Sequence, residues 1–529
     1  MINYNSNINV HQMTNRTAIL IMIFGLLPLI LSAQSSPTKQ TCMPCEKLKD
    51  LQLPDVTILT AESLASDTIA REGWMPEVVI SIPFCKITGR ISKEINFELF
   101  VPQQWNGRFL MAGNGGFAGR IQNNFRHYTN EGYAVAATDT GHQGSEISAA
   151  WAFNNMERQL NFGRLAVHRT AVVCKSILND LFCSYPTYSY FMGCSRGGGQ
   201  AMMEAQVYPT DFNGIVAGAP AFNWPAFGAQ FIRGCQNIYP DGKSTSQSVI
   251  TTENLKLLQD HVFRQCDKLD GIADRILTDP RKCKIDLTKL PRCAGNKVAA
   301  NCFTEEQVKA IKSIYDPLVL NEKVIYPGFP VGLEAEPNAW DTWITGTSPH
   351  MGGMPSLHYF FGTDMYKYLV FNDSTWDYTK YSFNNFSEET RFASSYLDAT
   401  STDYSEFKKA GGKMIMHHGW NDPALSAYAT IEHYEQAMQK DKDLQSYVRL
   451  FLLPGVLHCG GGTGPDNIDW LKIIRDWVEN GNAPERLVAS KSENGKIIMT
   501  RPIFPYPKLT VYSGNGNVNE EKNFTSTVK

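Results

Sequence analysis

The stretch YFMGCSRGGGQAMMEA, Tyr190 to Ala205, decides the fold. An apolar run ends at Gly193, and a segment rich in helix-forming residues begins after Ser195. Gly-x-Ser-x-Gly between a strand and a helix is the nucleophile-elbow pattern, in which the flanking glycines permit a sharp, strained turn. The turn lifts the serine hydroxyl above the sheet edge, with the helix N-terminus behind it. We therefore interpret Ser195 as a nucleophile rather than as part of an ordinary structural turn.

A regular alternation of predicted elements surrounds this turn. Short apolar runs that end in Gly, Asp or Asn turn residues alternate with helical patterns such as Arg164–Phe182 and Trp470–Asn480. Strands that alternate with helices predict an α/β fold, a largely parallel sheet with helices on both faces. The predicted strands lie within residues 97–102, 108–116, 133–141, 188–193, 214–220, 412–422 and 447–455.

The alternation weakens between Ala221 and Tyr404, a region rich in cysteine, aromatic and turn residues. We interpret the chain as one α/β domain, residues 34–220 and 405–516, interrupted by an inserted subdomain at residues 221–404. Residues 517–529 are expected to form a polar tail without regular structure.

The N-terminus has the features of an export signal. Arg16 precedes the apolar run Ala18–Leu31, and Ala33 supplies a small residue before a cleavage site. Because the run is short and contains a glycine and a proline, a cleaved signal over residues 1–33 is favoured over a membrane anchor. The sequence therefore predicts a secreted or periplasmic protein. A net charge of −3 gives no reason to expect nucleic acid or an anionic membrane as a partner.

A nucleophilic serine needs a base and an acid that orients the base. After a nucleophile elbow these partners follow in the order Asp or Glu, then His, each on a loop after a strand. Asp422 and His458 occupy those places behind Ser195. His417 and His418 are rivals for the base, but they end the strand before Asp422, so we expect them to support the site.

Backbone N–H groups are expected to stabilise the oxyanion. One belongs to Arg196, directly after the nucleophile, and the second comes from the glycine-rich loop after residues 108–112. Gly115 and Gly116 are the candidates, and the sequence does not separate them. A plain glycine-rich turn is the alternative.

Twelve cysteines follow the signal, an even number that indicates disulfides in an exported chain. Cys194 precedes Ser195, and Cys459 follows His458. If the serine and the histidine meet, the two cysteines come within disulfide reach, and a bridge would hold the base against the nucleophile. Two buried free thiols are the alternative.

The segment CDKLDGIADRILTDPRKC, Cys266 to Cys283, crowds the carboxylates of Asp267, Asp270 and Asp274. Hard oxygen ligands of this kind suit calcium, with backbone carbonyls completing the shell. The spacing differs from that of an EF-hand, and a solvated acidic turn is an equal alternative from composition.

The chain resembles the tannase and feruloyl esterase family of secreted α/β-hydrolases. The matching motifs run in the family's order over roughly residues 41–516: GNGGFAG (113–119), TDTGH (138–142), GCSRGGGQ (193–200), CDKLDGIADRI (266–276), GGKMIMHHGWNDPALS (411–426), LHCGGGTGPD (457–466) and RPIFPYP (501–507). The Cys-Ser elbow together with a His-Cys loop is highly specific to this family.

The resemblance implies an α/β-hydrolase fold with a large inserted lid, Ser195 as nucleophile, His458 as base and Asp422 as its orienter. It implies disulfides that join Cys194 to Cys459, Cys266 to Cys283 and Cys293 to Cys302. It also implies a structural calcium site with side-chain oxygens from Asp267, Asp270 and Asp274 and carbonyls from Ile272 and Ile276.

Two features depart from the family's pattern. The cysteine pair that many members carry near the C-terminus is absent here. Cys174, Cys183 and Cys235 have no assignable partner, and Cys42 and Cys45 compete for Cys85.

These observations predict a secreted serine carboxylesterase that acts on esters of aromatic acids. Feruloyl esters, including those linked to plant polysaccharide, are the first choice, with galloyl esters second and terephthalate monoesters also represented in the family. An acyltransferase and a non-catalytic carbohydrate-binding protein are the rivals from other classes. The aromatic and Met-rich segment His350–Phe371 either lines the acid pocket or forms the insertion's own core.

Overall fold

A nine-stranded sheet organises the computed structural model, which describes residues 41–528 except residues 74, 243 and 246. The predicted signal, residues 1–33, lies outside the described residues. In sheet order the strands are β1 (Val56–Leu64), β4 (Phe84–Ile91), β5 (Ile95–Pro102), β7 (Ala134–Thr138), β6 (Arg108–Ala112), β8 (Tyr188–Cys194), β9 (Gly214–Gly218), β12 (Lys413–Gly419) and β13 (Val448–Leu453).

The sheet is mixed rather than parallel throughout. Strands β7, β6, β8, β9, β12 and β13 pair in parallel, whereas β1, β4 and β5 add an antiparallel edge. The α/β-hydrolase-like fold predicted from the sequence is therefore confirmed. The sequence missed β1 and β4 because antiparallel neighbours need no crossover helix, so no strand–helix alternation marks them.

Both faces of the parallel part of the sheet are buried, and neighbouring residues of each strand face opposite layers. In β6, Phe109 and Met111 belong to the core that includes helix α2 (Ala166–Phe182) and helix α3 (Arg196–Val207). Leu110, between them, packs into the second core with helix α12 (Trp470–Asn480). This two-sided burial holds the carboxyl ends of the strands rigidly, and the loops that leave these ends carry the site described below.

Three further helices complete this part of the chain. Helix α10 (Ser405–Lys409) contacts α3, α11 (Ala427–Lys440) packs against β12, and the short α1 (Met156–Leu160) contacts α9 (Phe386–Leu397) of the insertion.

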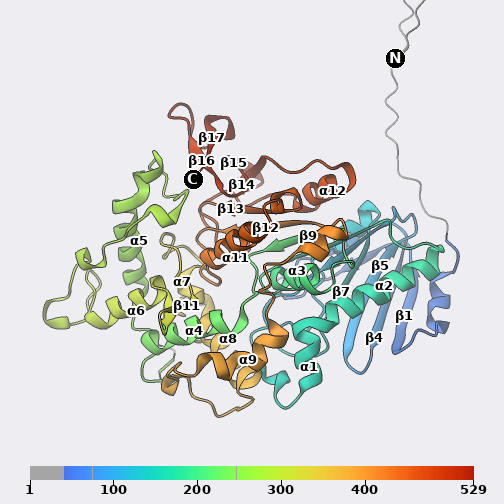
Figure 1. The fold of residues 1–529 in the computed structure, drawn as a ribbon, viewed down its shortest axis with the longest axis horizontal. Coiled ribbons are helices and arrows are strands. Elements are labelled where there is room, and N and C mark those ends of the chain that lie inside the picture. The colour runs from blue at the N-terminus through green and yellow to red at the C-terminus, as the bar shows by residue number, and fades with distance from the viewer. Residues whose placement is uncertain (1–40, 74, 243, 246, 529) are drawn as a thin grey trace, which may run out of the picture. The chain divides into compact units, whose positions relative to one another are not determined.

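A large helical insertion separates β9 from β12, although these two strands are paired neighbours in the sheet. It forms the green, yellow and orange region beside the sheet in Figure 1. Its helices are α4 (Trp224–Ile238), α5 (Thr252–Cys266), α6 (Glu305–Tyr315), α7 (Trp340–Trp343), α8 (Leu357–Asp364) and α9 (Phe386–Leu397), and its only hairpin among the described residues pairs β10 (Leu318–Leu320) with β11 (Lys323–Tyr326).

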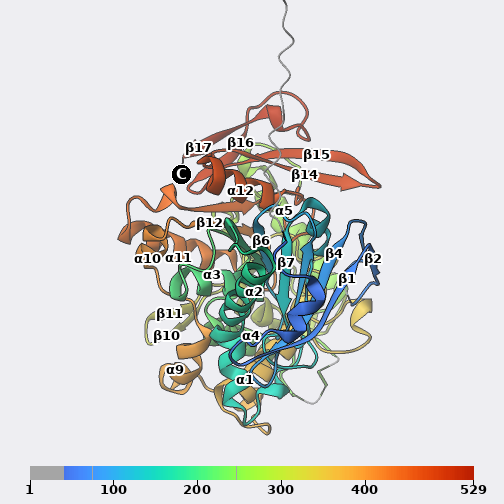
Figure 2. The same cartoon turned by 90° about the vertical axis from the view of Figure 1, so that its right-hand side faces the viewer.

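Two C-terminal hairpins lie beyond α12 and occupy the upper part of Figure 2. Strand β14 (Leu487–Glu493) pairs with β15 (Lys496–Ile503), and β16 (Lys508–Tyr512) pairs with β17 (Phe524–Val528). The expectation of a tail without regular structure is therefore wrong for β17. Phe524 is buried and its ring packs 5.4 Å from that of Tyr512, an anchor that polar composition does not reveal. A further small two-stranded sheet pairs β2 (Asp67–Ile69) with β3 (Val78–Ile80).

Five disulfides cross-link the chain. They join Cys42 to Cys183, Cys45 to Cys85, Cys194 to Cys459, Cys266 to Cys283 and Cys293 to Cys302. Cys174 and Cys235 are buried free thiols. This number of disulfides fits an extracellular protein. Within the described ranges, no helix combines the length and the apolar character needed to span a bilayer.

Candidate active site

The elbow predicted from the sequence is formed by the end of β8, Ser195 and the start of α3. Ser195 has φ 63° and ψ −120°, a strained conformation for a residue with a side chain. A Cβ atom on Gly193 would lie 2.6 Å from the backbone of Gly197, so glycine is required where the strand and helix approach. The glycines of the turn thus permit its backbone conformation, and this conformation places Ser195 between the strand and the helix.

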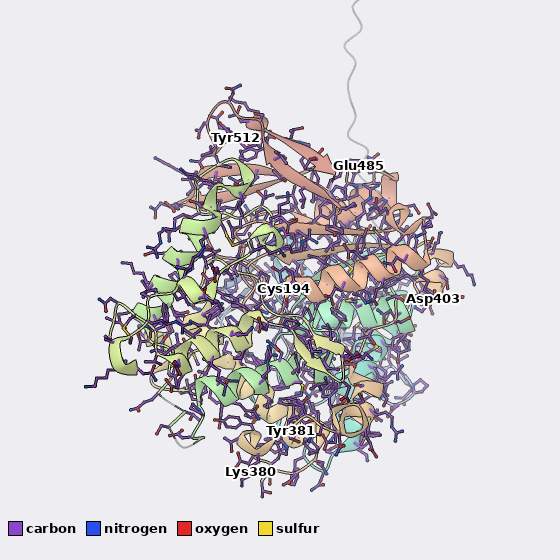
Figure 3. All side chains as sticks on the ribbon, turned by 60° about the vertical axis from the view of Figure 1, so that its left-hand side comes forward. Cys194, Lys380, Tyr381, Asp403, Glu485 and Tyr512 are labelled. Carbon is purple, nitrogen blue, oxygen red and sulfur yellow. A yellow bond between two sulfur atoms is a disulfide. The ribbon has the colours of Figure 1, made fainter. Side chains whose placement is uncertain are left out.

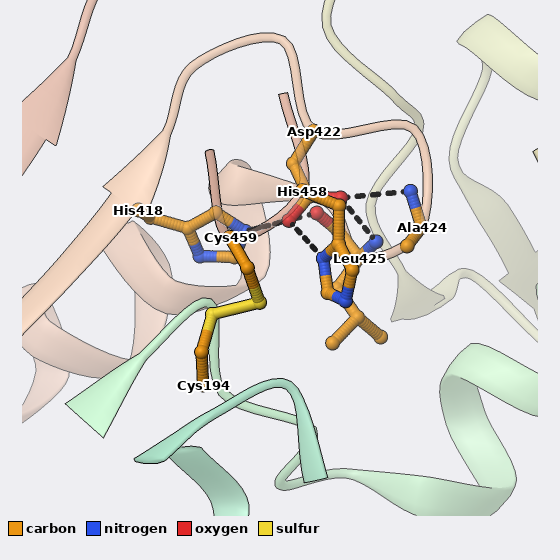
Figure 4. Close-up of a disulfide and its surroundings, with 7 residues drawn as sticks. All are labelled: Cys194, His418, Asp422, Ala424, Leu425, His458 and Cys459. Atoms are coloured by element: carbon orange, nitrogen blue, oxygen red, sulfur yellow. Dashed lines mark hydrogen bonds and ion pairs between the residues drawn. A yellow bond between two sulfur atoms is a disulfide. The ribbon is translucent and has the colours of Figure 1, made fainter. Parts of the chain in front are cut away.

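Asp422 and His458, from the loops after β12 and β13, are hydrogen-bonded to each other (Figure 4). His458 Nδ1–H donates to Asp422 Oδ2 at 2.7 Å. A carboxylate on Nδ1 fixes the tautomer that leaves the Nε2 lone pair free to accept a proton.

The Asp422 carboxylate is held by three further donors. Its Oδ1 accepts the N–H groups of Ala424 at 2.7 Å and Leu425 at 2.9 Å. Its Oδ2 also accepts Nε2–H of His418 at 3.1 Å. Burial opposes ionisation, but attraction to His458 and the hydrogen bonds from both histidines hold the pKa of Asp422 below its ordinary value. Asp422 is therefore a stable anion at the bottom of the site.

A disulfide joins the elbow to the histidine loop. Cys194 and Cys459 are bonded, with their Cα atoms 5.9 Å apart, and the bridge stands beside the acid and base in Figure 4. Cys194 is labelled near the centre of the view in Figure 3. Ser195 and His458 line the same cavity, although no hydrogen bond joins the hydroxyl to the imidazole among the described residues.

Gly115 and Gly116, the two candidates for the second oxyanion N–H, differ in their hydrogen bonds and surroundings. The N–H of Gly115 donates to Oε1 of Gln122, so it is already occupied. Gly116 lines both the cavity and the recess beside Ser195, and its φ of 56° and close approach to the carbonyl of Glu146 require glycine. The N–H of Arg196 opens α3, where the first helical donors have no intrahelical acceptor.

The cavity lined by Ser195 and His458 has a volume of about 600 Å³ and is bounded on one side by the insertion. Trp343, Leu357 and Phe361 line it, and the Trp343 ring lies 4.9 Å from the His458 ring. Of the predicted aromatic segment 350–371, only part faces the cavity, while Met365, Tyr366 and Leu369 are buried in the core. Sequence reasoning missed Trp343, which lies just outside that segment.

A small apolar recess opens beside Ser195 between the sheet and the insertion. Its aromatic walls are Trp224, Phe227, Phe231, Trp343 and Phe361. The main cavity, in contrast, also carries polar side chains, namely Gln122, Asn124, Glu146, Asp466 and Asn467. Ser195 therefore lies between an apolar and a polar compartment.

The two histidines at the end of β12 have different surroundings. His418 is fully buried against Asp422, with Nδ1 2.9 Å from Thr430 Oγ1. His417 lines the cavity and stacks on Trp470, with ring centroids 4.3 Å apart, and burial lowers its pKa to about 3. His418 therefore contacts Asp422 without lining the cavity, His417 lines the cavity without a hydrogen bond to Asp422 among the described residues, and only His458 does both.

The acidic loop between Cys266 and Cys283 turns its carboxylates toward nearby donors. Asp267 accepts the N–H of Arg275 at 2.7 Å, and Asp274 pairs with the buried Arg501 at 2.8 Å. Burial, with repulsion from Asp274, raises the pKa of both Asp267 and Asp270. Asp274 is therefore already paired with a cation, and the three carboxylates do not form a cluster with all ligand atoms within 4.8 Å.

A different group of side chains has its ligand atoms within 4.8 Å of one another. In the part of the chain that the structure describes, His168, Glu204 and Asp211 are the one set of three His, Cys, Asp or Glu residues placed to hold a metal ion. It is a candidate metal site of two buried acids and one partly exposed histidine, and nothing about it favours calcium. No motif in the sequence marks His168, Glu204 or Asp211 as a group, because they become neighbours only when α2 and α3 pack.

The fold and this site define an esterase of the α/β-hydrolase class. Residues 77–527 match the family model for tannase and feruloyl esterase. The chain belongs to that family and is a carboxylic ester hydrolase, which confirms the resemblance seen in its motifs.

Relatives and solved structures agree with this assignment. A probable feruloyl esterase B-2 of Aspergillus fumigatus is 29% identical over 538 residues, covering 94% of this chain and 98% of the relative. An uncharacterised esterase of Xanthomonas campestris is 31% identical over 543 residues, covering 92% of each chain. The crystal structure of feruloyl esterase B from Aspergillus oryzae superposes with a TM-score of 0.81 at 26% identity, covering 91% of this chain and 99% of that one. A tannin acyl hydrolase from Aspergillus niger, with a TM-score of 0.71 at 20% identity over 90% of this chain and 92% of that one, shares the fold.

Proposed function

We propose that this protein is a secreted serine esterase that cleaves feruloyl-type esters with a Ser195–His458–Asp422 triad. The hydrogen bond of 2.7 Å between His458 and Asp422, next to the disulfide that ties their loop to the elbow, carries the proposal. His458 accepts the proton of Ser195 Oγ as that oxygen attacks the ester carbonyl. The N–H groups of Arg196 and Gly116 stabilise the oxyanion, with Gly116 favoured because Gly115 donates elsewhere.

The remaining steps, release of the alcohol and hydrolysis of the acyl-enzyme, use the same groups. Collapse of the tetrahedral intermediate breaks the bond to the alcohol oxygen, which leaves with the proton that His458 returns. The acyl group remains on Ser195. A water molecule then gives a proton to His458 and attacks the acyl carbonyl, and the acid leaves as Ser195 regains its proton.

The two compartments on either side of Ser195 suggest how a substrate binds. The apolar recess suits the aromatic acid, and the larger cavity with its polar side chains suits an alcohol part such as a sugar. The recess holds about 30 Å³, so Phe227 or Phe361 must move before a ring can enter. The name feruloyl esterase B among relatives supports the feruloyl choice, and galloyl esters and terephthalate monoesters are the alternatives.

Hydrolysis of three esters by the purified mature chain tests the function. Methyl ferulate, methyl gallate and a simple acetyl ester are compared, each with wild type and with Ser195→Ala. We expect methyl ferulate to have the highest kcat/KM and Ser195→Ala to abolish its turnover. A preference for methyl gallate would assign the galloyl alternative, and a preference for the acetyl ester would show that the recess stays closed to rings.

Two added controls address the other classes. An alcohol acceptor that competes with water for the acyl group would identify an acyltransferase. Oligosaccharide binding that is equal in wild type and Ser195→Ala, without turnover of any ester, would identify a binding protein.

We also propose that the loop of Asp267, Asp270 and Asp274 binds a structural calcium ion. The carboxylates, with the carbonyls of Ile272 and Ile276, are hard oxygen donors, and the raised pKa of two of the acids reflects charge that a cation would neutralise. A bound calcium ion would stabilise the loop of the insertion and has no part in the steps at Ser195. Removal of calcium with a chelator should lower Tm by several degrees, and re-addition should restore it, whereas an unchanged Tm would contradict a calcium site.

A further inference from the structure

A second cluster of ligand-type side chains lies between α2 and α3, and none of its members lines the catalytic cavity. His168 belongs to α2, Glu204 to α3, and Asp211 to the turn that follows α3. One ligand atom from each lies within 4.8 Å of the other two. The cluster thus joins two helices and a turn at a single point.

Glu204 supplies the observation that points to a ligand. Its side chain is 1% exposed, and its Oε2 atom has no hydrogen-bond partner. A buried carboxylate oxygen without a donor is strongly unfavourable, and native structures contain few of them. The neighbouring Asp211 is also buried; burial first, and then the charge of Asp211 and its hydrogen bond with the Glu204 carboxyl group, raise the pKa of Glu204 well above its ordinary value.

The donors around the cluster do not satisfy this oxygen. His168 Nδ1 is 2.6 Å from Asp211 Oδ2. The amine of Lys175 donates to the main-chain carbonyl of Asp211. Both His168 and Lys175 therefore bond to Asp211, and neither donates a hydrogen bond to the Oε2 atom of Glu204.

We propose that His168, Glu204 and Asp211 bind a divalent transition metal ion of the zinc type. One imidazole nitrogen and two carboxylate oxygens are a ligand set that zinc accepts, whereas calcium takes oxygen ligands only. Tetrahedral zinc with bonds of about 2.0–2.2 Å places its ligand atoms roughly 3.4 Å apart, which small side-chain rotations reach from the present spacing.

The surroundings of the cluster would let a metal ion enter from solvent, and they fix the orientation of the His168 ring. The His168 side chain is 31% exposed, so water can complete the coordination from the solvent side. Its ring stacks on Tyr208 with centroids 3.9 Å apart and planes 6° apart, which fixes the direction of the ring nitrogens. Lys175 opposes a cation here, but its bond to the Asp211 carbonyl holds its amine on the main chain; Arg164 interacts with the Tyr208 hydroxyl.

Such an ion would have a structural role. It would fasten α3, the helix that begins directly after Ser195, to α2 and to the turn before β9. We expect its effect on stability to exceed its effect on the rate of ester hydrolysis.

The experiment uses the full mature chain, saturated with calcium throughout so that the acidic loop does not contribute. Bound zinc is counted by elemental analysis after dialysis, and Tm is measured with zinc and with a zinc-selective chelator. We expect one zinc ion per chain and a Tm increase of about 3 °C when free zinc is ~100-fold above Kd.

Matched variants identify the ligands. Glu204→Gln and Asp211→Asn should lose both the bound zinc and the Tm increase. Glu334→Gln makes the same change at a buried glutamate of the insertion, which also has an unpartnered oxygen, and should keep both. Because His168 is partly exposed, His168→Asn should fold even where the other variants do not, and it should bind zinc at least 10-fold more weakly.

Two results would overturn the proposal. One is the absence of stoichiometric zinc in folded wild type. The other is zinc binding by His168→Asn or Glu204→Gln equal to that of wild type. Either result would leave a proton shared between Glu204 and Asp211 as the explanation of the unpartnered oxygen.

Discussion

Two buried carboxyl groups near opposite ends of α3 have opposite ionisation behaviour. Asp422 and Glu204 are each 1% exposed. Asp422 accepts hydrogen bonds from His458, His418, Ala424 and Leu425, and its pKa lies below the ordinary value. Burial and the nearby Asp211 raise the pKa of Glu204 well above its ordinary value, and Oε2 has no donor. Burial depth alone therefore does not determine charge; the donors that the fold supplies do.

We expect the largest effect on activity when the negative charge of Asp422 is removed. Asp422→Asn keeps the shape but loses the anion that fixes the His458 tautomer, so kcat/KM should fall by about 10⁴-fold. Steady-state kinetics with the preferred ester measure the loss. A fall of less than about 10-fold, in a variant with wild-type Tm, would contradict the role of Asp422.

The disulfide between the elbow and the histidine loop should contribute both stability and activity. Replacing Cys194 and Cys459 together by serine should lower the free energy of unfolding by about 2–5 kcal/mol and reduce kcat/KM. Denaturant unfolding and kinetics measure the two effects. The matched control replaces Cys293 and Cys302, which close a short loop of the insertion, and should leave kcat/KM unchanged. Equal loss of activity in both pairs would show that the first bridge does not position the base.

One donor to Asp422 can be removed while the other three remain. His418→Phe deletes the Nε2–H bond to Asp422, and we expect kcat/KM to fall by about 10-fold, because the carboxylate loses one of the hydrogen bonds that hold it in line with His458 Nδ1. With one donor fewer, Asp422 stabilises the His458 imidazolium more strongly, so the acidic limb of the kcat/KM profile should move to higher pH. His418→Gln retains an N–H donor and should restore most of the rate. A lower rate without any change of the pH profile would indicate that His418 is only structural.

The smallest expected effect is the pH dependence of stability. The folded pKa of Asp422 lies below the value of 3.8 for an ordinary aspartate, so its carboxylate stabilises the fold above that pH. This contribution disappears as pH falls toward the folded pKa. The difference in unfolding free energy between wild type and Asp422→Asn should therefore shrink by about 1 kcal/mol or more between pH 6 and pH 3. A difference that is constant with pH would mean that Asp422 is not held as an anion.

Much of the site could be predicted because its determinants are local. The glycines around Ser195 are needed by the turn itself, and Asp422 and His458 directly follow apolar strands of the expected length. The adjacency of Cys194 to Ser195 and of Cys459 to His458 turned one predicted contact into a predicted disulfide, which the structure contains. The pairing of Cys42 with Cys183 has no such local marker, since it depends on where α2 ends.

The other features of the site and fold depend on contacts between segments that are far apart in the sequence. Trp343 reaches His458 from the insertion, and Gly116 differs from Gly115 only because the Gln122 side chain turns back onto the latter. Strands β1, β4 and β17 pair antiparallel, and such pairs need no crossover helix, so no strand–helix alternation marks them in the sequence.

The sequence by itself determined the α/β class, the elbow and the order of the acid and the base, because turn geometry and strand–helix alternation are encoded in neighbouring residues. Only the tertiary structure decided which donors surround each buried acid. Asp422 meets two histidines and two backbone N–H groups, while Glu204 meets Asp211 and keeps an unpartnered oxygen. Those partners come from other elements, so the charge of a buried carboxyl group is a property of packing rather than of sequence.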